Sequence, residues 1–194
     1  MRVITGRYKG RTLRTVKDLS VRPATDRVRQ TIFNMLANRL EFDGALVLDL
    51  FAGSGSLGIE ALSRGASRAT FVESGREAAS AIRENLATLG CDDDSDVYQV
   101  DALEFLGTET GSYDLVFADP PYAYEPTETL PRAIFERRLV RPGGYLIIEH
   151  STDLQFSSTP LFDAGPVKKF GRTLVTFFRN PSNGATDRHL SRDV

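Results

Sequence analysis

The amino-acid sequence predicts an α/β fold with a mostly parallel, twisted sheet. From residue 45 onward, short runs rich in Val, Leu and Ile alternate with stretches of helical spacing. Strands that are apolar throughout are typical of parallel sheets, which helices cover on both faces. Near the end, two more apolar runs flank Gly171-Arg172 and predict a hairpin that supplies one antiparallel edge strand. The expected strands are residues 45–50, 69–73, 97–100, 113–118, 145–149, 167–170 and 173–178.

Two helices are well marked in the sequence. Residues 76–89 place apolar side chains on one face, with the spacing of an amphipathic helix. An earlier helix is expected to begin after Arg22, where Thr25 or Asp26 can accept hydrogen bonds from its first N–H groups. The apolar positions of this earlier helix are Val28, Ile32, Phe33, Leu36 and Leu40.

Length and composition indicate one globular domain. The chain has 194 residues, of which 41% are hydrophobic and 26% charged, as in ordinary soluble proteins. We expect a small basic β-hairpin extension over residues 1–21, a single α/β domain over 22–179 and a mobile polar tail over 180–194. Cys91 is the only cysteine, which excludes an internal disulfide. Because no signal-peptide core or membrane span is found, we expect a cytoplasmic protein without membrane contacts, and we expect it to be a monomer.

Positive charge is concentrated at the N-terminal end. Residues 1–40 contain ten Lys and Arg and two Asp, a net charge of +8, whereas the whole chain has −2. Segregated charge of this kind indicates a polyanionic partner that meets the N-terminal segment. A hairpin within residues 2–17 would project several of these side chains, with Tyr8 available to stack on a base. The predicted RNA-binding residues are Arg7, Lys9, Arg11, Arg14, Arg22 and Arg27.

A glycine-rich turn joins the first strand of the sheet to the following helix. Gly53, Gly55 and Gly58 let a ligand approach the backbone, where the helix N-terminus presents N–H groups. Dinucleotide-binding proteins use the same spacing. However, Asp49 lies four residues before the first glycine, at the strand tip, where a carboxylate would repel a pyrophosphate and attract an ammonium group. S-adenosylmethionine carries an ammonium group, and we therefore predict it as the cofactor.

Two more acids follow successive strands of the predicted sheet. Glu73 ends the second strand, where a carboxylate can accept both hydroxyls of a ribose, and Asp101 follows the third, where it can accept an adenine amino group. Ligands of open α/β sheets bind at the carboxyl ends of the strands, which is where these acids would meet. The predicted cofactor-binding residues are Asp49, Phe51, Gly53, Gly55, Glu73, Asp101 and Ala102.

The tetrapeptide Asp119-Pro120-Pro121-Tyr122 follows the fourth strand and predicts the reaction. An exocyclic amine on a nucleic-acid base is a poor nucleophile, because its lone pair is delocalised into the ring. The Asp119 carboxylate and the Pro120 carbonyl can accept both N–H bonds of such an amine, and Tyr122 offers a face on which an extruded base can stack. Catalysis would then be positional and electrostatic. We predict these four residues as the catalytic site of an amino-methyltransferase.

The glycine-rich turn and the tetrapeptide together resemble those of the Rossmann-like class I amino-methyltransferases. Other segments are similar to the bacterial 16S ribosomal RNA guanine-N2 methyltransferases of the RsmD type. The resemblance covers residues 1 to about 179 and is carried by residues 2–6, 10–13, 22–29, 60–66 and 169–173. It implies methyl transfer to a guanine N2 in 16S rRNA, on an assembling or assembled small ribosomal subunit. It also implies cofactor and amine contacts at the positions given above.

Three other functions fit part of the pattern. A DNA adenine-N6 or cytosine-N4 methyltransferase uses the same tetrapeptide, but the chain offers no spare segment for a target-recognition domain. A nucleotide-binding module without catalysis would not need the intact tetrapeptide, and a nicotinamide oxidoreductase is disfavoured by Asp49. No metal site is predicted, because the acidic residues 92–96 lack the Gly and Glu of a calcium loop. His150 is expected to be structural or exposed at a rim rather than a general base.

Overall fold

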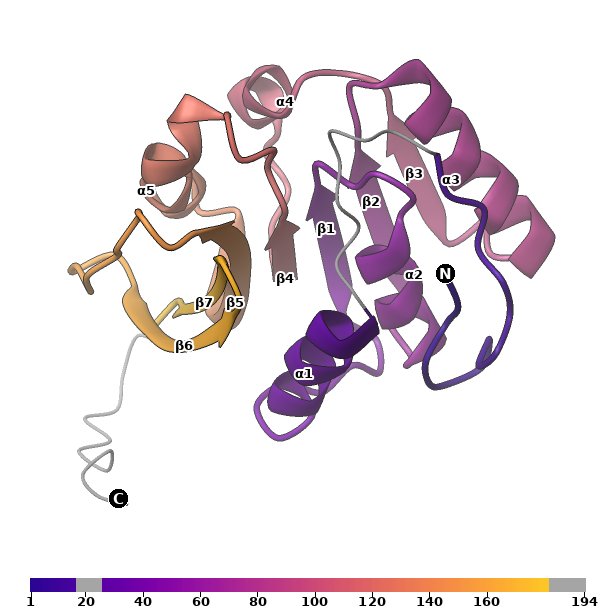
Figure 1. Cartoon of the computed structure of the whole chain (residues 1–194), viewed down its shortest axis with the longest axis horizontal. Coiled ribbons are helices and arrows are strands. Elements are labelled where there is room, and N and C mark those ends of the chain that lie inside the picture. The colour runs from indigo at the N-terminus through magenta and orange to yellow at the C-terminus, as the bar shows by residue number, and fades with distance from the viewer. Residues whose placement is uncertain (17–25, 182–194) are drawn as a thin grey trace.

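The computed structural model describes residues 1–16 and 26–181, which form a seven-stranded sheet with helices on both faces (Figure 1). The strand order is β3-β2-β1-β4-β5-β7-β6. Strands β1 to β5 are parallel to one another, whereas β7 is antiparallel to both of its neighbours. The strands are β1 Leu46–Leu50, β2 Arg68–Val72, β3 Ser95–Tyr98, β4 Tyr113–Ala118, β5 Val140–Ser151, β6 Asp163–Phe170 and β7 Thr173–Arg179. The predicted fold class is confirmed. The antiparallel strand is β7, which lies between β5 and the edge strand β6.

The helices divide between the two faces because side chains alternate along each strand. On one face, Val47, Phe117 and Ile147 are buried together with apolar residues of α1, α2 and α3. On the other face, Leu48 and Leu146 are buried with residues of α4 and α5. The helices are α1 Asp26–Leu36, α2 Ser56–Ser63, α3 Arg76–Leu89, α4 Ala102–Thr108 and α5 Leu130–Glu136, with the short 3-10 helix η1 Glu125–Thr129 before α5. The helix expected over residues 76–89 is confirmed.

The fifth strand is longer than the sequence pattern predicts. The expected segment 145–149 is the middle of Val140–Ser151, which also contains a Pro-Gly-Gly run. This run stays in the sheet because Gly143 donates to the Asn180 carbonyl at 2.9 Å, and the Asn180 N–H donates to Gly144 at 3.0 Å. A Cβ atom on Gly144 would lie only 2.7 Å from the Asp114 carbonyl. Glycine therefore permits the close approach of β4 and β5 here, where a turn would otherwise be expected.

The N-terminal segment turns back on itself, but a single antiparallel bridge between Arg2 and Thr12 takes the place of two regular strands. One reason is that α2 takes several of the N–H groups that a regular strand would use for pairing. Glu60 of α2, which is 1% exposed, accepts from Ile4 N at 2.7 Å and Thr5 N at 3.0 Å. The segment therefore lies against α2 and α3 as part of the body of the domain (Figure 1).

Some expectations fall outside the described residues. Arg22 and the candidate helix cap Thr25 belong to the undescribed segment 17–25, and most of the predicted tail belongs to 182–194. Helix α1 begins at Asp26 and ends at Leu36, so Leu40 lies beyond it. Among the described residues, no helix is both long and apolar enough to span a membrane.

Candidate active site at the carboxyl edge of the sheet

Three acids meet where the central parallel strands end. The register pairs Leu50 of β1 with Ala118 of β4, and Ala118 with Ile148 of β5. Asp119, directly after β4, and Glu149, within β5, therefore lie at the same level, and the N–H of Asp119 donates to the Leu50 carbonyl at 3.4 Å. Asp49 lies one residue before Leu50 on β1, and it is 1% exposed. This convergence of carboxyl groups is the main electrostatic feature of the sheet edge.

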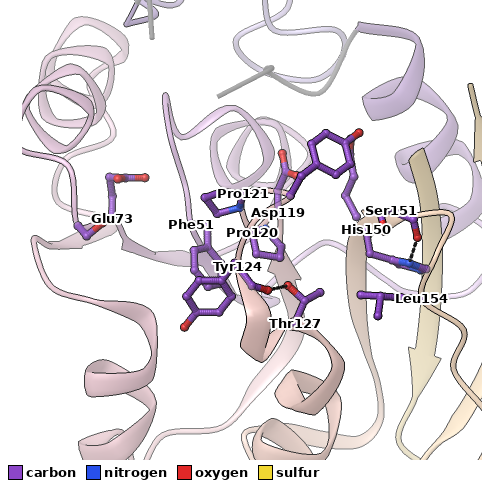
Figure 2. Close-up of a pocket in the computed structure, with 13 residues that line it drawn as sticks. Phe51, Glu73, Asp119, Pro120, Pro121, Tyr124, Thr127, His150, Ser151 and Leu154 are labelled. Carbon is purple, nitrogen blue, oxygen red and sulfur yellow. Dashed lines mark hydrogen bonds between the residues drawn. The ribbon is translucent and has the colours of Figure 1, made fainter. Parts of the chain in front are cut away.

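The predicted catalytic tetrapeptide lines a cavity of about 120 Å³. Figure 2 shows Asp119, Pro120 and Pro121 in the middle of it, with Glu73 on one side and His150 and Ser151 on the other. The Pro121 carbonyl accepts a hydrogen bond from Tyr124 N at 2.8 Å. Within the described part of the chain, the Pro120 carbonyl has no hydrogen-bond partner. The cavity therefore offers the acceptor that the sequence analysis assigned to the substrate amine.

Tyr122 stands at the mouth of this cavity. Its side chain is 58% exposed, and its hydroxyl is hydrogen-bonded to the Thr173 hydroxyl at the start of β7. Anchoring at the hydroxyl holds the ring in place while much of it faces solvent. Such a ring can stack against a flat ligand at a low entropic cost, because it is already ordered.

Burial and like charges raise the pKa values of two of these acids. The pKa of Asp119 is raised well above its usual range, first by removal from water and then by the charges of Glu149 and Asp49. Burial also raises the pKa of Asp49 to about 8, against the stabilising hydrogen bond from Gly58 N at 2.9 Å. In the absence of a cation, Asp49 therefore holds a proton at neutral pH. A ligand with a positive charge or several N–H donors would favour the ionised carboxylates.

The glycine-rich turn between β1 and α2 is held by Glu73. One carboxylate oxygen of Glu73 accepts from Gly53 N at 2.8 Å, and the other accepts from Gly75 N at 2.7 Å. Gly53 has a φ of 57° and open space where a Cβ atom would be, so the turn leaves its surface accessible. Phe51 also has a positive φ of 57°, a strained conformation for a non-glycine residue, and its ring makes an edge contact with Tyr124.

The other predicted cofactor residues lie at the start of α4. Asp101 is the N-cap of this helix, since its carboxylate accepts from Leu103 N at 2.8 Å and Glu104 N at 3.3 Å. Ala102 is buried, and neither residue lines the cavity around Asp119. Sequence analysis did not foresee the capping role, although an acid before a helix is a typical cap. The assignment of both residues to cofactor binding stays a prediction.

A second, larger hollow of about 890 Å³ adjoins Tyr122. We call it the basic groove, because Arg27 of α1 and Lys169 and Arg172 of the β6–β7 hairpin line it. Tyr122, Glu149 and Ser151 line both the cavity and the groove. The lining also includes the acids Glu149 and Asp153, so the groove connects three basic side chains, with acids between them and the cavity, to the tetrapeptide. Arg27 was predicted from the sequence as a nucleic-acid contact, whereas Lys169 and Arg172 were not, although they belong to the segment 169–173 that carries part of the family resemblance.

The remaining predicted RNA-binding residues lie elsewhere. Arg7 is 3.6 Å from Asp94, directly before β3, and Arg11 donates to the Thr88 carbonyl near the end of α3. Both therefore lie near the amino end of β3, at the opposite edge of the sheet from Asp119. Arg14 pairs with Glu84 on α3, and Lys9 is exposed on the same N-terminal turn.

The expectation that Tyr8 is available for stacking is wrong. Its ring is only 8% exposed, because the N-terminal segment packs against α2, where Ser63 Oγ accepts from Tyr8 N at 2.9 Å.

His150 and the acidic loop have structural roles. His150 is 4% exposed, and its ring nitrogens contact the Ser151 carbonyl at 2.9 Å and the Thr176 hydroxyl at 2.8 Å. Burial lowers its pKa, so the ring is neutral and held in place. In the acidic segment 92–96, Asp96 pairs with Arg68 at 2.8 Å. Among the described residues there is no group of three or more His, Cys, Asp or Glu side chains that could hold a metal ion.

Comparisons with known proteins show which proteins this chain is similar to. A family model described as Conserved hypothetical protein 95 matches residues 1–179. The Bacillus subtilis (strain 168) protein YlbH, provisionally named an rRNA methyltransferase, is 41% identical over 163 residues, which are 82% of this chain and 87% of that protein. Ribosomal RNA small subunit methyltransferase D of Haemophilus influenzae is 35% identical over 79% of this chain and 80% of its own length. The solved structure of Escherichia coli yhhF, provisionally named a methyltransferase, superposes with a TM-score of 0.82 at 31% identity, covering 94% of this chain and 99% of that one.

Proposed function

Because the chain belongs to the Conserved hypothetical protein 95 family, that of the RsmD-type methyltransferases, we propose that it transfers a methyl group from S-adenosylmethionine to the exocyclic N2 of a guanine in 16S rRNA. The observation that carries the proposal is the meeting of Asp119 and Pro120 with Glu73, the residue that holds the glycine-rich turn, in one cavity beside a basic groove. The names of the relatives support ribosomal RNA of the small subunit as the substrate.

The residues around the glycine-rich turn fit the cofactor. When bound, S-adenosylmethionine supplies an electrophilic methyl group on a sulfonium. Asp49 offers a buried carboxylate to the ammonium group, and Glu73 offers oxygens to the ribose hydroxyls while it continues to hold Gly53. The accessible backbone of Gly53 lets a ligand lie directly on the turn. Asp101 and Ala102, at the start of the neighbouring helix, complete the proposed contacts.

The tetrapeptide positions the substrate amine. Asp119 accepts one N–H of the guanine amine and the Pro120 carbonyl accepts the other, so that the nitrogen lone pair is directed at the methyl carbon. A bound cofactor would supply the methyl group to this nitrogen and would leave as the neutral thioether, and the amine would give up one proton to solvent. Removing one preorganised electrostatic contact of this kind typically lowers the rate by ~10²–10³. Tyr122 stacks on the extruded base, which its exposed ring and anchored hydroxyl favour.

The basic groove is the proposed path of the RNA next to the target base. Arg27, Lys169 and Arg172 are exposed and can contact phosphates on the approach to Tyr122. The N-terminal residues Arg7, Lys9, Arg11 and Arg14 remain predicted contacts for a more distant part of the substrate, because they lie on the α3 side of the molecule. Arg22 is also retained as a predicted contact.

The test is transfer of tritium from labelled S-adenosylmethionine to small ribosomal subunits, to free 16S rRNA and to duplex DNA, followed by nucleoside analysis. We expect label in N2-methylguanosine from one or both ribosomal substrates. Label in N6-methyladenine or N4-methylcytosine of DNA would support the DNA methyltransferase alternative. Absence of transfer to every substrate, from a protein that binds the cofactor, would contradict the proposed activity.

A further inference from the structure

Glu149 occupies the junction between the cavity and the basic groove. It lines both, together with Tyr122. The register of β4 and β5 places it level with Asp119, one residue beyond the paired Ala118 and Ile148. Because side chains two residues apart on a strand point to the same face, Asp119 and Glu149 share the face of Phe117 and Ile147. Asp119 and Glu149 also line the same cavity, so a base whose amine reaches Asp119 can place a neighbouring ring atom at Glu149.

The atom next to the amine distinguishes guanine from the other amino-bearing bases. In guanine, the N2 amine has the N1–H donor on one side. In adenine, the N6 amine has the N1 acceptor there, and in cytosine the N4 amine has the N3 acceptor. An ionised carboxylate can only accept hydrogen bonds. It therefore pairs with guanine N1–H and repels the lone pair that adenine or cytosine would present.

We propose that Glu149 accepts a hydrogen bond from N1–H of the target base and thereby makes the site selective for guanine. This inference rests on the proposed function. A carboxylate has about four acceptor positions, so Glu149 can accept from the base while keeping a contact that it already makes. The raised pKa of Asp119 supports the proximity of the two carboxyl groups.

Two other titratable groups near the cavity are less suited to this role. Asp49 is 1% exposed and already accepts from Gly58 N. Both ring nitrogens of His150 are held by Ser151 and Thr176. Glu149 also makes a contact of its own, but it is partly exposed at the cavity wall, where a base can reach its remaining acceptor positions. A site that relies on a hydrogen bond to its substrate can reject an analogue without that group by ~10⁴-fold or more, because the group in the site is left unpaired.

The base analogue 2-aminopurine tests the inference without any mutation. It carries the same 2-amino group as guanine, but its N1 is an acceptor instead of a donor. The modified guanine is first located in 16S rRNA by nucleoside analysis, and RNA is then assembled with 2-aminopurine at that one position. We expect the wild-type protein to methylate the guanine RNA at least ~10²-fold faster than the 2-aminopurine RNA. Equal rates on the two RNAs would overturn the inference.

The variant Glu149→Gln gives the second readout, because an amide can donate to the N1 of 2-aminopurine. We expect its rate on guanine to fall by ~10²–10³ and the preference for guanine over 2-aminopurine to shrink by at least ~10-fold. Glu149→Asp keeps the carboxylate and should keep the preference at a reduced rate. Glu104→Gln removes an exposed carboxylate on α4 and is the charge-matched control, with wild-type rates and preference.

Two controls separate the possible failures. Circular dichroism and cofactor titration show whether each variant is folded and binds the cofactor. A folded Glu149→Gln protein with an unchanged guanine preference would overturn the inference alone. If the wild-type protein methylated no guanine N2 in 16S rRNA, the proposed function would fail first, and the inference would fail with it.

Discussion

Replacing Asp49 by Asn should make the free protein more stable, and increasingly so as the pH rises. Asp49 is 1% exposed, and its pKa of about 8 compares with 3.8 for an unperturbed Asp. Between these two values the folded protein keeps a proton that the unfolded chain has lost. The free energy of unfolding of the wild-type protein therefore falls with rising pH, by about 1.4 kcal/mol per pH unit from this group.

The corresponding Asn cannot titrate, yet its amide oxygen can still accept from Gly58 N. The difference in unfolding free energy, Asp49→Asn minus wild type, should therefore grow by about 2 kcal/mol between pH 6 and pH 8 and level off above that range. The assay is urea denaturation of both proteins at several pH values without cofactor. Parallel stability curves over this range would refute the argument that Asp49 is a buried, protonated acid.

The same proton is informative about the cofactor. The ammonium group of S-adenosylmethionine would favour the ionised carboxylate, so binding at about pH 7 should release a proton from Asp49. Isothermal titration in buffers of different ionisation enthalpy measures this release, and Asp49→Asn corrects for titration of the ligand amine. Equal proton release by the two proteins would mean that Asp49 does not face the ammonium group.

Three further outcomes are expected. Asp119→Ala should lower the rate of methyl transfer by ~10²–10³ while leaving cofactor affinity nearly unchanged. A near-normal rate in a single-turnover assay would contradict the role of Asp119 in holding the substrate amine. Changing Lys169 and Arg172 to Gln should weaken RNA binding. It should also reduce the slope of the logarithm of the binding constant against the logarithm of the salt concentration by about 1 to 2. The triple change of Arg7, Lys9 and Arg11 to Gln should reduce this slope by about 2 to 3 only if the RNA also reaches the α3 side. Slopes equal to wild type in both variants would place the RNA on another surface. Gly6→Ala should lower the free energy of unfolding in urea titrations by at least ~2 kcal/mol, because the new Cβ atom would lie 1.8 Å from the Ser63 carbonyl oxygen. Gly10 has a similar φ but open space around it, so Gly10→Ala is the matched control and should lower the free energy of unfolding by less.

Much of the fold and the reaction chemistry could be predicted from local patterns. The helix Arg76–Leu89 and the apolar strands could be predicted because the spacing of apolar side chains within one element indicates its type. This spacing depends little on the rest of the chain. The glycine-rich turn and the Asp119 tetrapeptide each consist of neighbouring residues, so their chemistry could be predicted from the sequence alone. The expected meeting of the acids at one edge of the sheet then followed from the general position of ligands in parallel sheets.

Only the tertiary structure decided which distant groups meet. Glu149 reaches the level of Asp119 through the register of β4 with β5. Arg27 lines the same groove as Lys169 and Arg172, because α1 and the β6–β7 hairpin border one hollow. The same packing buried Tyr8. The register between strands and the packing of helices on the sheet depend on the free energy of burying many side chains at once. These side chains belong to elements far apart in the sequence, so no pattern of neighbouring residues predicts the result.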